Sequence, residues 1–241
     1  MLLLFSTLAD ADVTAEKYVK YLQHLPTKTK KYRFFKLLLP PARKVDKELR
    51  ALYLQTKKDI ENGTHKKRLQ ALMKKYKAED YLDLLKRIKP HPLSITLAQA
   101  AIESAWGTSR FFVEANNVFG MWSSTSNPED TIEASKSRQG GKKIHLKRYK
   151  SIEESIRAYY KNLATNNAYR CFRQARYYND NPYELAPLLH RYSEKGELYT
   201  TELVKIIINN NLTRYDTKIP LPRYIGYNKE KMDTNASKAI K

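Results

Sequence analysis

Cysteine, glycine and long apolar runs are scarce in this sequence of 241 residues. The single cysteine, Cys171, excludes an internal disulfide, and there is neither a Cys-x-x-Cys pair nor a spaced histidine pair to indicate a metal site. No apolar stretch approaches the roughly 20 residues that a membrane-spanning helix needs. With 41% hydrophobic residues and seven glycines, the chain has enough apolar material for a core and reads largely as amphipathic helix. We therefore expect a helical globular protein with no metal and no cofactor.

Acidic residues are also in the minority. The chain has 25 Asp and Glu against 45 Lys and Arg, a formal charge of +20 and an isoelectric point of about 9.8. The basic residues are spread along the chain, which favours a long-range field that attracts acidic polymers over one binding stripe. Nucleic acid, anionic lipid and the bacterial cell wall are all compatible partners. Because no nucleic-acid-binding motif is present, specific binding of nucleic acid is the weakest of these readings.

The first residues, "MLLLFSTLADADV", resemble the end of an export signal. Ala9-Asp10-Ala11 fits a cleavage site of the A-x-A type, but the apolar run is short and no basic segment precedes it. We predict that residues 1–13 are either the remnant of such a signal or a disordered start.

Residues 14–89 are predicted to form a helical N-terminal segment. The apolar run 34–39 is expected to stop at Pro40-Pro41. Apolar residues at helical spacing then continue to Asn62-Gly63, a typical helix end. This segment carries no visible chemistry.

The stretch "SITLAQAAIESAWGTSR" predicts the next helix, from about Ile95 to Ala105, with Ser94 as its cap and Gly107 as its terminator. We expect one buried face, formed by the apolar residues Ile95, Ala98, Ile102 and Ala105. Glu103 falls in the last turn, where the negative end of the helix dipole opposes a carboxylate. Gln99 lies one turn earlier and can address the same space.

The hydrophobic pattern changes from helical spacing to short alternating segments between residues 121 and 150. Two short alternating segments, "TIEASKS" and "KKIHLKRY", are separated by Gln139-Gly140-Gly141 and predict a β-hairpin. A helix should begin after Ser151, where "SIEE" fits a capping box, and further helices are expected over 183–190 and 198–211. The remaining residues, 217–241, form a basic tail.

Four blocks of the sequence now point to one family. They are "LAQAAIESAWGTSRF", "NNVFGMW", "KRYKSIEESIRAYYKNLATNNAYRCFR" and "RYSEKGELYTTELVKIIINNNL", in that order. Together they resemble the glucosaminidase family of peptidoglycan hydrolases, glycoside hydrolase family 73, and within it the Bax-like bacterial proteins. The resemblance covers roughly residues 90–212 and extends to the helical segment before them. It implies an α+β, predominantly α-helical, lysozyme-like domain with a small β-hairpin over residues 90–216.

The resemblance also implies an activity. The expected function is an endo-beta-N-acetylglucosaminidase that cleaves the bond after N-acetylglucosamine in peptidoglycan glycan strands, in the cell envelope. Hydrolysis needs a donor that keeps its proton near neutral pH. Glu103 fits, because both the helix end and the neighbouring Trp106 are expected to raise the pKa of its carboxyl.

The second carboxylate is less well defined. Glu133 in the predicted hairpin is the best candidate, with Glu129 and Asp130 behind it. If none of them faces Glu103, the N-acetyl group of the substrate itself can act as nucleophile.

Other candidates surround these two carboxylates. Tyr192 matches a cleft tyrosine of the family, where it would position the substrate or stabilise the reacting sugar. Asn117 is expected to shape the cleft through hydrogen bonds, and Phe119 to be mostly structural. Trp106 and Trp122 could each offer an apolar wall to a sugar, with core packing as the competing role for Trp106. The residues predicted to bind substrate are Gln99, Trp106, Asn117, Phe119, Trp122 and Tyr199.

Two alternatives remain open. A lytic transglycosylase also uses a glutamate at a helix end, and would leave an anhydro-sugar on its product. A non-catalytic peptidoglycan-binding module could keep the fold and lose the chemistry.

Overall fold

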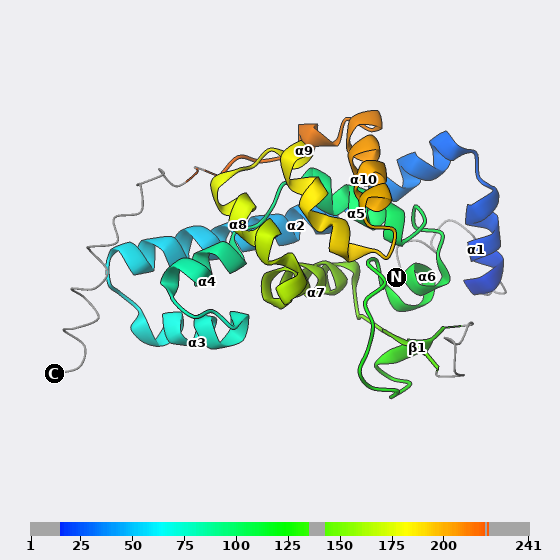
Figure 1. The fold of residues 1–241 in the computed structure, drawn as a ribbon. Helices are drawn as coiled ribbons and strands as arrows, with labels where there is room; N and C mark the ends of the chain where they lie inside the picture. The colour runs from blue at the N-terminus through cyan, green and yellow to red at the C-terminus, as the bar shows by residue number, and fades with distance from the viewer. Residues whose placement is uncertain (1–14, 135–142, 220, 222–241) are drawn as a thin grey trace.

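The computed structural model describes residues 15–134, 143–219 and 221, and these fold mainly as helices with one small sheet (Figure 1). The α-helices are α1 (Ala15–His24), α2 (Thr27–Glu61), α3 (Lys66–Tyr76), α4 (Tyr81–Ile88), α5 (Leu93–Glu103), α6 (Arg110–Ala115), α7 (Ile152–Thr165), α8 (Arg170–Tyr178), α9 (Pro182–Leu185) and α10 (Glu197–Asn209). The 3₁₀ helices are η1 (Asn167–Tyr169), η2 (Ala186–Tyr192) and η3 (Leu212–Tyr215). The predicted mainly helical α+β class is confirmed.

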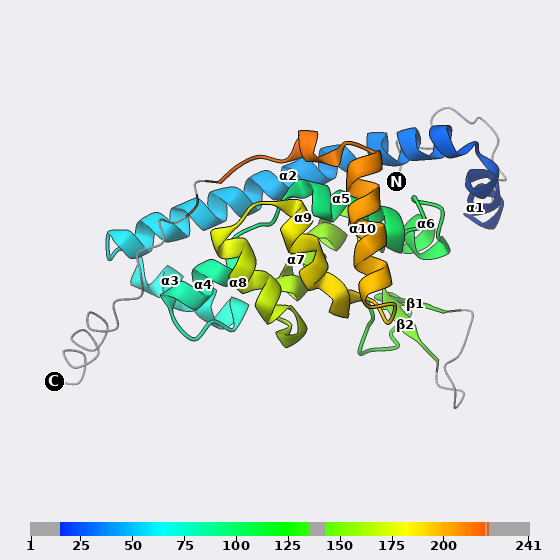
Figure 2. The same ribbon diagram turned by 45° about the horizontal axis from the view of Figure 1, so that its top comes forward.

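Helix α2 is 35 residues long and continues through Pro40 and Pro41, so the predicted break at this pair is wrong. Leu38, Ala42 and Val45 lie on both sides of the prolines and are fully buried. Their face packs against α5 and α7. Burial of this continuous apolar face offsets the cost of proline inside a helix, about 3 kcal/mol each. Figure 2 shows α2 along one side of the molecule, with the other helices packed beneath it.

Helix α5 lies at the centre of the main core. Residues 93–101 are all buried, where one buried face was expected, because α2, α10 and η3 pack around this helix. Ser94 was predicted to cap the helix, but it lies inside the first turn, after Pro92. Its backbone N–H and hydroxyl both donate to the carboxylate of Asp216, each at 2.7 Å. The capping group therefore comes from a residue 122 positions away, which local sequence cannot reveal.

The predicted hairpin is confirmed. Strands β1 (Thr131–Glu133) and β2 (His145–Lys147) pair antiparallel, with Ile132 opposite Leu146. These two side chains pack on Ala115 of α6 in a small separate cluster, so the hairpin projects beside α6 (Figure 2). The expected turn at Gln139-Gly140-Gly141 lies outside the described residues.

The later helices follow the sequence closely. Helix α7 begins after Ser151 as predicted, and the Ser151 hydroxyl accepts from the Glu154 N–H at 3.2 Å. The Glu154 carboxylate accepts from the Lys150 N–H, one residue earlier than a standard capping box. The segment predicted at 183–190 forms α9 and η2, and that at 198–211 forms α10. The start at 1–13 and nearly all of the tail at 217–241 lie outside the described residues.

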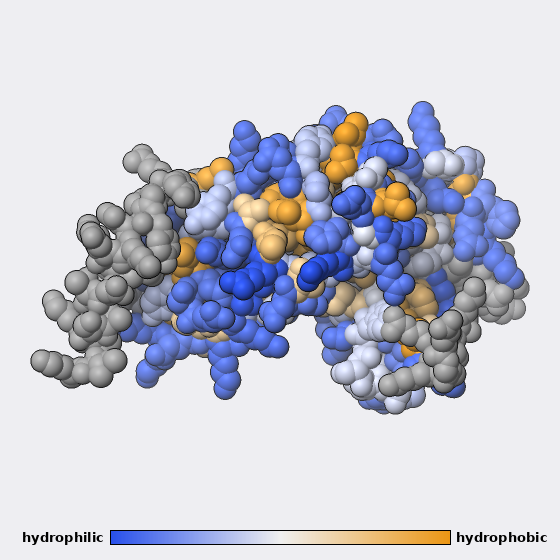
Figure 3. Space-filling view, viewed as in Figure 1, coloured by the Kyte–Doolittle hydropathy of each residue, from blue (hydrophilic) through white to orange (hydrophobic). Residues whose placement is uncertain are grey.

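The face of the molecule seen in Figure 3 is strongly polar. Figure 3 shows a face covered mostly by hydrophilic residues, with small apolar patches and a hollow beside the lobe that carries the hairpin. Within the part of the chain that the structure describes, no helix combines the length and the apolar character needed to cross a membrane.

Packing of α2 on the core generates the first prediction. Leu38→Ala should lower the free energy of unfolding by about 2–5 kcal/mol, because it leaves a cavity at a fully buried site. Leu54→Ala is the matched control: it lies on the same helix, is 48% exposed, and should change stability by less than about 0.5 kcal/mol. Urea unfolding followed by circular dichroism measures both. Equal effects would contradict the packing of α2 described above.

Candidate active site

Glu103 is the last residue of α5, two residues before the predicted helix end. The chain then turns through three consecutive residues with positive φ, namely Ala105 (50°), Trp106 (61°) and Gly107 (75°). The first two are not glycine, so this turn is strained. Hydrogen bonds hold it, since the Trp106 N–H donates to Ala101 O at 2.8 Å and the Gly107 N–H to Ser104 Oγ at 2.9 Å. The sharp turn leads the main chain away at once and leaves Glu103 at the helix tip.

The carboxyl of Glu103 is held in a partly buried position. Tyr199 of α10 donates a hydrogen bond to it. A methyl group added at Gly120 would lie 3.9 Å from Glu103 Oε2, so the "NNVFG" segment passes directly beside the carboxyl. Burial raises the pKa of Glu103 to about 7, while the Tyr199 hydrogen bond and the charge of Lys195 lower it and the charge of Glu202 raises it. The carboxyl can therefore remain protonated close to neutral pH.

A group of tyrosines lies next to this carboxyl. Tyr192 stacks on Tyr199, with ring centroids 5.8 Å apart and planes 9° apart, and also contacts Tyr159 and Tyr169. Its hydroxyl donates to Phe119 O at 3.3 Å. Burial and then the charge of Glu103 raise the pKa of Tyr192 well above 10. Tyr192 therefore keeps its proton and is neutral at physiological pH.

The segment 116–121 is fixed by Asn117, which is almost fully buried. Its Nδ2 donates to Met121 O at 3.0 Å and to Lys147 O at 2.8 Å, and its Oδ1 accepts from the Met121 N–H at 2.9 Å. Asn117 thus joins this segment to β2 and holds Gly120 at the carboxyl. Phe119 is 2% exposed and stacks on Tyr159 at 4.0 Å, which gives it a packing role.

Gln99 and Tyr199, both predicted to bind substrate, lie in the interior of the protein. Their side chains are buried, with 0% and 1% exposure. Gln99 Nε2 donates to the Tyr199 hydroxyl at 2.8 Å, and Gln99 Oε1 accepts from the Tyr159 hydroxyl at 2.5 Å. Both residues therefore lie behind Glu103, inside the protein.

The two tryptophans differ in exposure. Trp106 is partly buried and packs edge-on against Phe34 and Phe35 of α2, with both centroid distances 5.7 Å. The Lys31 ammonium lies 4.7 Å from its ring centre. Trp122 forms an isolated bridge to Leu146 of β2 and is 55% exposed. Core packing thus accounts for the position of Trp106, and Trp122 presents the larger apolar surface to solvent.

Glu133 ends β1, and its side chain is 46% exposed. Its carboxylate pairs with Lys143 at 3.1 Å, and its backbone carbonyl accepts from Arg110. Glu129 and Asp130 are exposed in the preceding turn. The charges that act on Glu103 come from elsewhere, from Lys195 and Glu202, and sequence reasoning missed both. The spacing of Tyr199 and Glu202, one helical turn apart, was the available signal.

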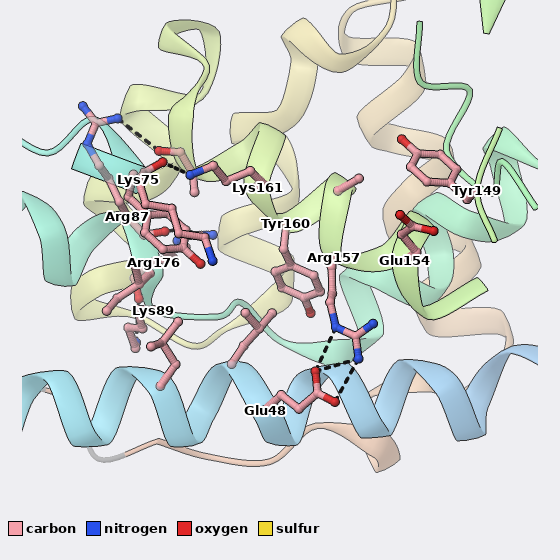
Figure 4. A pocket seen from close by; sticks show the side chains of 16 residues that line it. Glu48, Lys75, Arg87, Lys89, Tyr149, Glu154, Arg157, Tyr160, Lys161 and Arg176 are labelled. Atoms are coloured by element: carbon pink, nitrogen blue, oxygen red, sulfur yellow. Dashed lines mark hydrogen bonds and ion pairs between the residues drawn. The ribbon is translucent and has the colours of Figure 1, made fainter. Parts of the chain in front are cut away.

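A cavity of about 440 Å³ lies away from this site, beside α2 (Figure 4). Six cationic and two acidic residues line it, and none of the predicted site residues does. Several of its charges are already paired, as in the two 2.9 Å hydrogen bonds from Arg157 to Glu48. Burial and then the neighbouring cations lower the pKa of Lys161 to about 8. Among the described residues, no group of three or more His, Cys, Asp or Glu side chains could hold a metal ion.

Comparisons with known proteins agree with the sequence resemblance. The chain is 30% identical to Protein bax of Escherichia coli strain K12 over 157 residues, which is 59% of this chain and 54% of that protein. The chain thus spans about half the length of this curated relative. Two solved structures are also similar. The catalytic domain of the autolysin Auto from Listeria monocytogenes has a TM-score of 0.48 and 20% identity, over 86% of this chain and 99% of that one. The C-terminally truncated glycoside hydrolase domain of FlgJ from Salmonella typhimurium has a TM-score of 0.46 and 18% identity, over 75% of this chain and 97% of that one.

The sequence model of the glucosaminidase family, described as mannosyl-glycoprotein endo-beta-N-acetylglucosaminidase, matches residues 78–212. This range is more than half of the chain and contains Glu103, Gly120, Tyr192 and Tyr199. The chain belongs to the glucosaminidase family.

Proposed function

We propose that this protein is a peptidoglycan hydrolase, an endo-beta-N-acetylglucosaminidase that uses Glu103 as its general acid. The observation that carries the proposal is the carboxyl at the tip of α5, buried so that its pKa is about 7 and lying next to Gly120 of the "NNVFG" segment. A glycosidic oxygen leaves as an alcohol only if it receives a proton, and such a carboxyl is poised to give one. The family description supports cleavage next to N-acetylglucosamine.

The residues around Glu103 have distinct proposed roles. Tyr192 positions the substrate or stabilises the reacting sugar, since its ring stacks on Tyr199, which hydrogen-bonds the carboxyl, and its hydroxyl bonds Phe119 O next to Gly120. Trp122 offers an exposed indole on which the apolar face of a sugar can stack. Asn117 and Phe119 hold the segment that carries Gly120, and so shape the cleft from within.

The substrate and its location follow from charge and family. Peptidoglycan carries lactyl and stem-peptide carboxylates, and a protein with a net charge of +20 is drawn to it by long-range attraction. We therefore place the protein in the cell envelope, periplasmic or secreted, with glycan strands as its partner.

Glu103→Gln supplies the central test. Glutamine keeps the shape of the side chain but cannot donate the proton, so peptidoglycan digestion should slow roughly a hundredfold or more. Products are resolved by mass after borohydride reduction, and reduced N-acetylglucosamine ends should disappear in the variant. Glu61→Gln is the control, because this exposed glutamate lies at the far end of α2 and should leave the rate unchanged.

The same experiment separates the alternatives. Anhydro-muramic ends on the products would identify a lytic transglycosylase. Tight binding of the cell wall by both proteins without any release of fragments would identify a binding module and reject the hydrolase.

The pKa of Glu103 predicts the pH dependence. A general acid must be protonated, so kcat/KM should fall about tenfold per pH unit above about pH 7. Lys195→Met removes a charge that lowers this pKa and should move the alkaline limb to higher pH. Glu202→Gln removes a charge that raises it and should move the limb to lower pH. Both shifts should be about a few tenths of a unit and shrink with added salt. Shifts in the same direction would contradict this account.

Glu133 remains our proposal for the second carboxylate. Glu133→Gln should then lower kcat about a hundredfold without changing the thermal unfolding temperature, because the side chain is half-exposed. Glu61→Gln, at the exposed far end of α2, is again the control and should retain activity. A loss of less than threefold in Glu133→Gln would remove this residue from the mechanism and favour attack by the N-acetyl group of the substrate.

A further inference from the structure

A continuous series of buried hydrogen bonds leads from the interior of the protein to Glu103. Arg176 Nη1 lies 3.5 Å from His91 Nδ1, and His91 Nε2 lies 3.1 Å from the Tyr159 hydroxyl. Tyr159 donates to Gln99 at 2.5 Å, Gln99 donates to Tyr199 at 2.8 Å, and Tyr199 donates to Glu103. The five groups before Glu103 come from α8, the turn before α5, α7, α5 and α10. We refer to this series as the buried chain.

The two ends of the buried chain fix its direction. A guanidinium has only donors, so His91 Nδ1 must accept from Arg176, and Nε2 must carry the ring proton. Burial, and then the nearby Arg176 charge, keep the pKa of His91 well below 6.5, which leaves one ring proton only. The single Nε2 proton is therefore shared, in a bifurcated hydrogen bond, between the Tyr159 oxygen and Thr96 Oγ1, which lies 2.9 Å away.

The direction then passes along the rest of the buried chain. Because Tyr159 accepts from His91, its own proton points at Gln99 Oε1. This orients the Gln99 amide, whose NH₂ group faces the Tyr199 oxygen. With its oxygen occupied by that donor, Tyr199 directs its proton at Glu103. Every group in the series donates toward the carboxyl.

Burying the Arg176 guanidinium costs free energy, because the cation loses its hydration. It is 1% exposed at the wall of the cavity in Figure 4, and its Nη2 donates to Arg87 O at 2.6 Å. Its Nε has no hydrogen-bond partner within the described residues. Burial and then Arg173 lower its pKa to about 9, so it remains a cation at neutral pH. A buried donor-only group at this point sets the polarity of everything that follows it.

We propose that Arg176, His91, Tyr159 and Gln99 are positioning residues that act through Tyr199, so that one oxygen of Glu103 always accepts a hydrogen bond and the other carries the catalytic proton toward the substrate. The proposal rests on the proposed role of Glu103 as general acid. Tyr199 accepts from Gln99 and directs its own proton at the carboxyl, so Glu103 meets a donor on its interior side. The acidic proton is thereby excluded from the interior side.

Variants of Gln99 and Tyr199 test the proposal. The other groups that face Glu103 are Tyr169 from η1, Tyr192 from η2, Lys195 before α10 and Glu202 on α10, and all of them stay unchanged. Tyr199→Phe removes the hydrogen bond to the carboxylate and should raise the pKa of Glu103 by about one unit. Gln99→Met should raise it by less, because Tyr199 remains but loses its orientation.

A third and a fourth variant test whether the donor direction of the hydrogen bonds along the buried chain matters. Gln99→Glu keeps the size of the side chain but offers two acceptor oxygens, so Tyr199 should turn its proton away from Glu103. The pKa of Glu103 should then rise at least as much as in Gln99→Met. Arg176→Met removes the fixed end and should give a smaller rise in the same direction. Each of the four should lower kcat about tenfold with little change in KM.

The measurement is a titration of the 241-residue protein with ¹³C-labelled glutamate side chains, in which the Glu103 signal is identified by its loss in Glu103→Gln. Thr56→Val is the control, since it removes a buried hydroxyl that bonds to none of the described residues and lies outside the buried chain. An unchanged Glu103 pKa in Tyr199→Phe and Gln99→Met would overturn the proposal, even if both proteins unfold at lower temperature. If the variants shift the Glu103 pKa as expected but the unsubstituted protein releases no glycan, the buried chain is upheld and the proposed function is rejected.

Discussion

The burial of one carboxyl at the tip of α5 is the constraint on which the rest of the site depends. Glu103 sits where lost hydration and the helix dipole both oppose ionisation. Its pKa in the folded protein, about 7, exceeds the usual 4.5. The resulting contribution to stability is fully present below pH 4.5 and is lost as the pH rises through 7. The hydrogen bond from Tyr199 and the charge of Lys195 limit that loss, because both favour the ionised form.

The position of this carboxyl depends on a part of the chain outside the family-matched range. Phe34 and Leu38 of α2 precede residue 78, yet they share one core with α5 and α10. Phe34 also packs on Trp106, in the strained turn that follows Glu103. A Cβ at Gly107 would lie 3.2 Å from the Phe34 ring, so the turn and α2 fit closely. Helix α2 thus directly supports the end of α5 that carries Glu103.

The features that depend on interactions between residues close in sequence were predicted correctly from the sequence pattern. The glutamate at the helix end, the alternating strands of the hairpin and the cap at Ser151 were all found in this way. The prediction at Pro40-Pro41 was wrong because packing on distant helices outweighs helix propensity. The places of Gln99 and Tyr199 also depend on distant partners. Gln99 lies one helical turn before Glu103 in the sequence, and only the packing of α7 and α10 shows that Gln99 and Tyr199 are buried and bonded to each other.

Three polar residues on α5 explain why this helix can sit in only one orientation. Ser94 bonds Asp216, Thr96 bonds His91 and Tyr160, and Gln99 bonds Tyr159 and Tyr199. An apolar helix buried on all sides could rotate or slide at little cost, because its neighbours would meet similar side chains in each position. Here a rotation by one residue, about 100°, would strand three buried polar groups at about 1–3 kcal/mol each. The polar contacts therefore fix the rotation of α5, and with it the direction in which Glu103 leaves the helix tip.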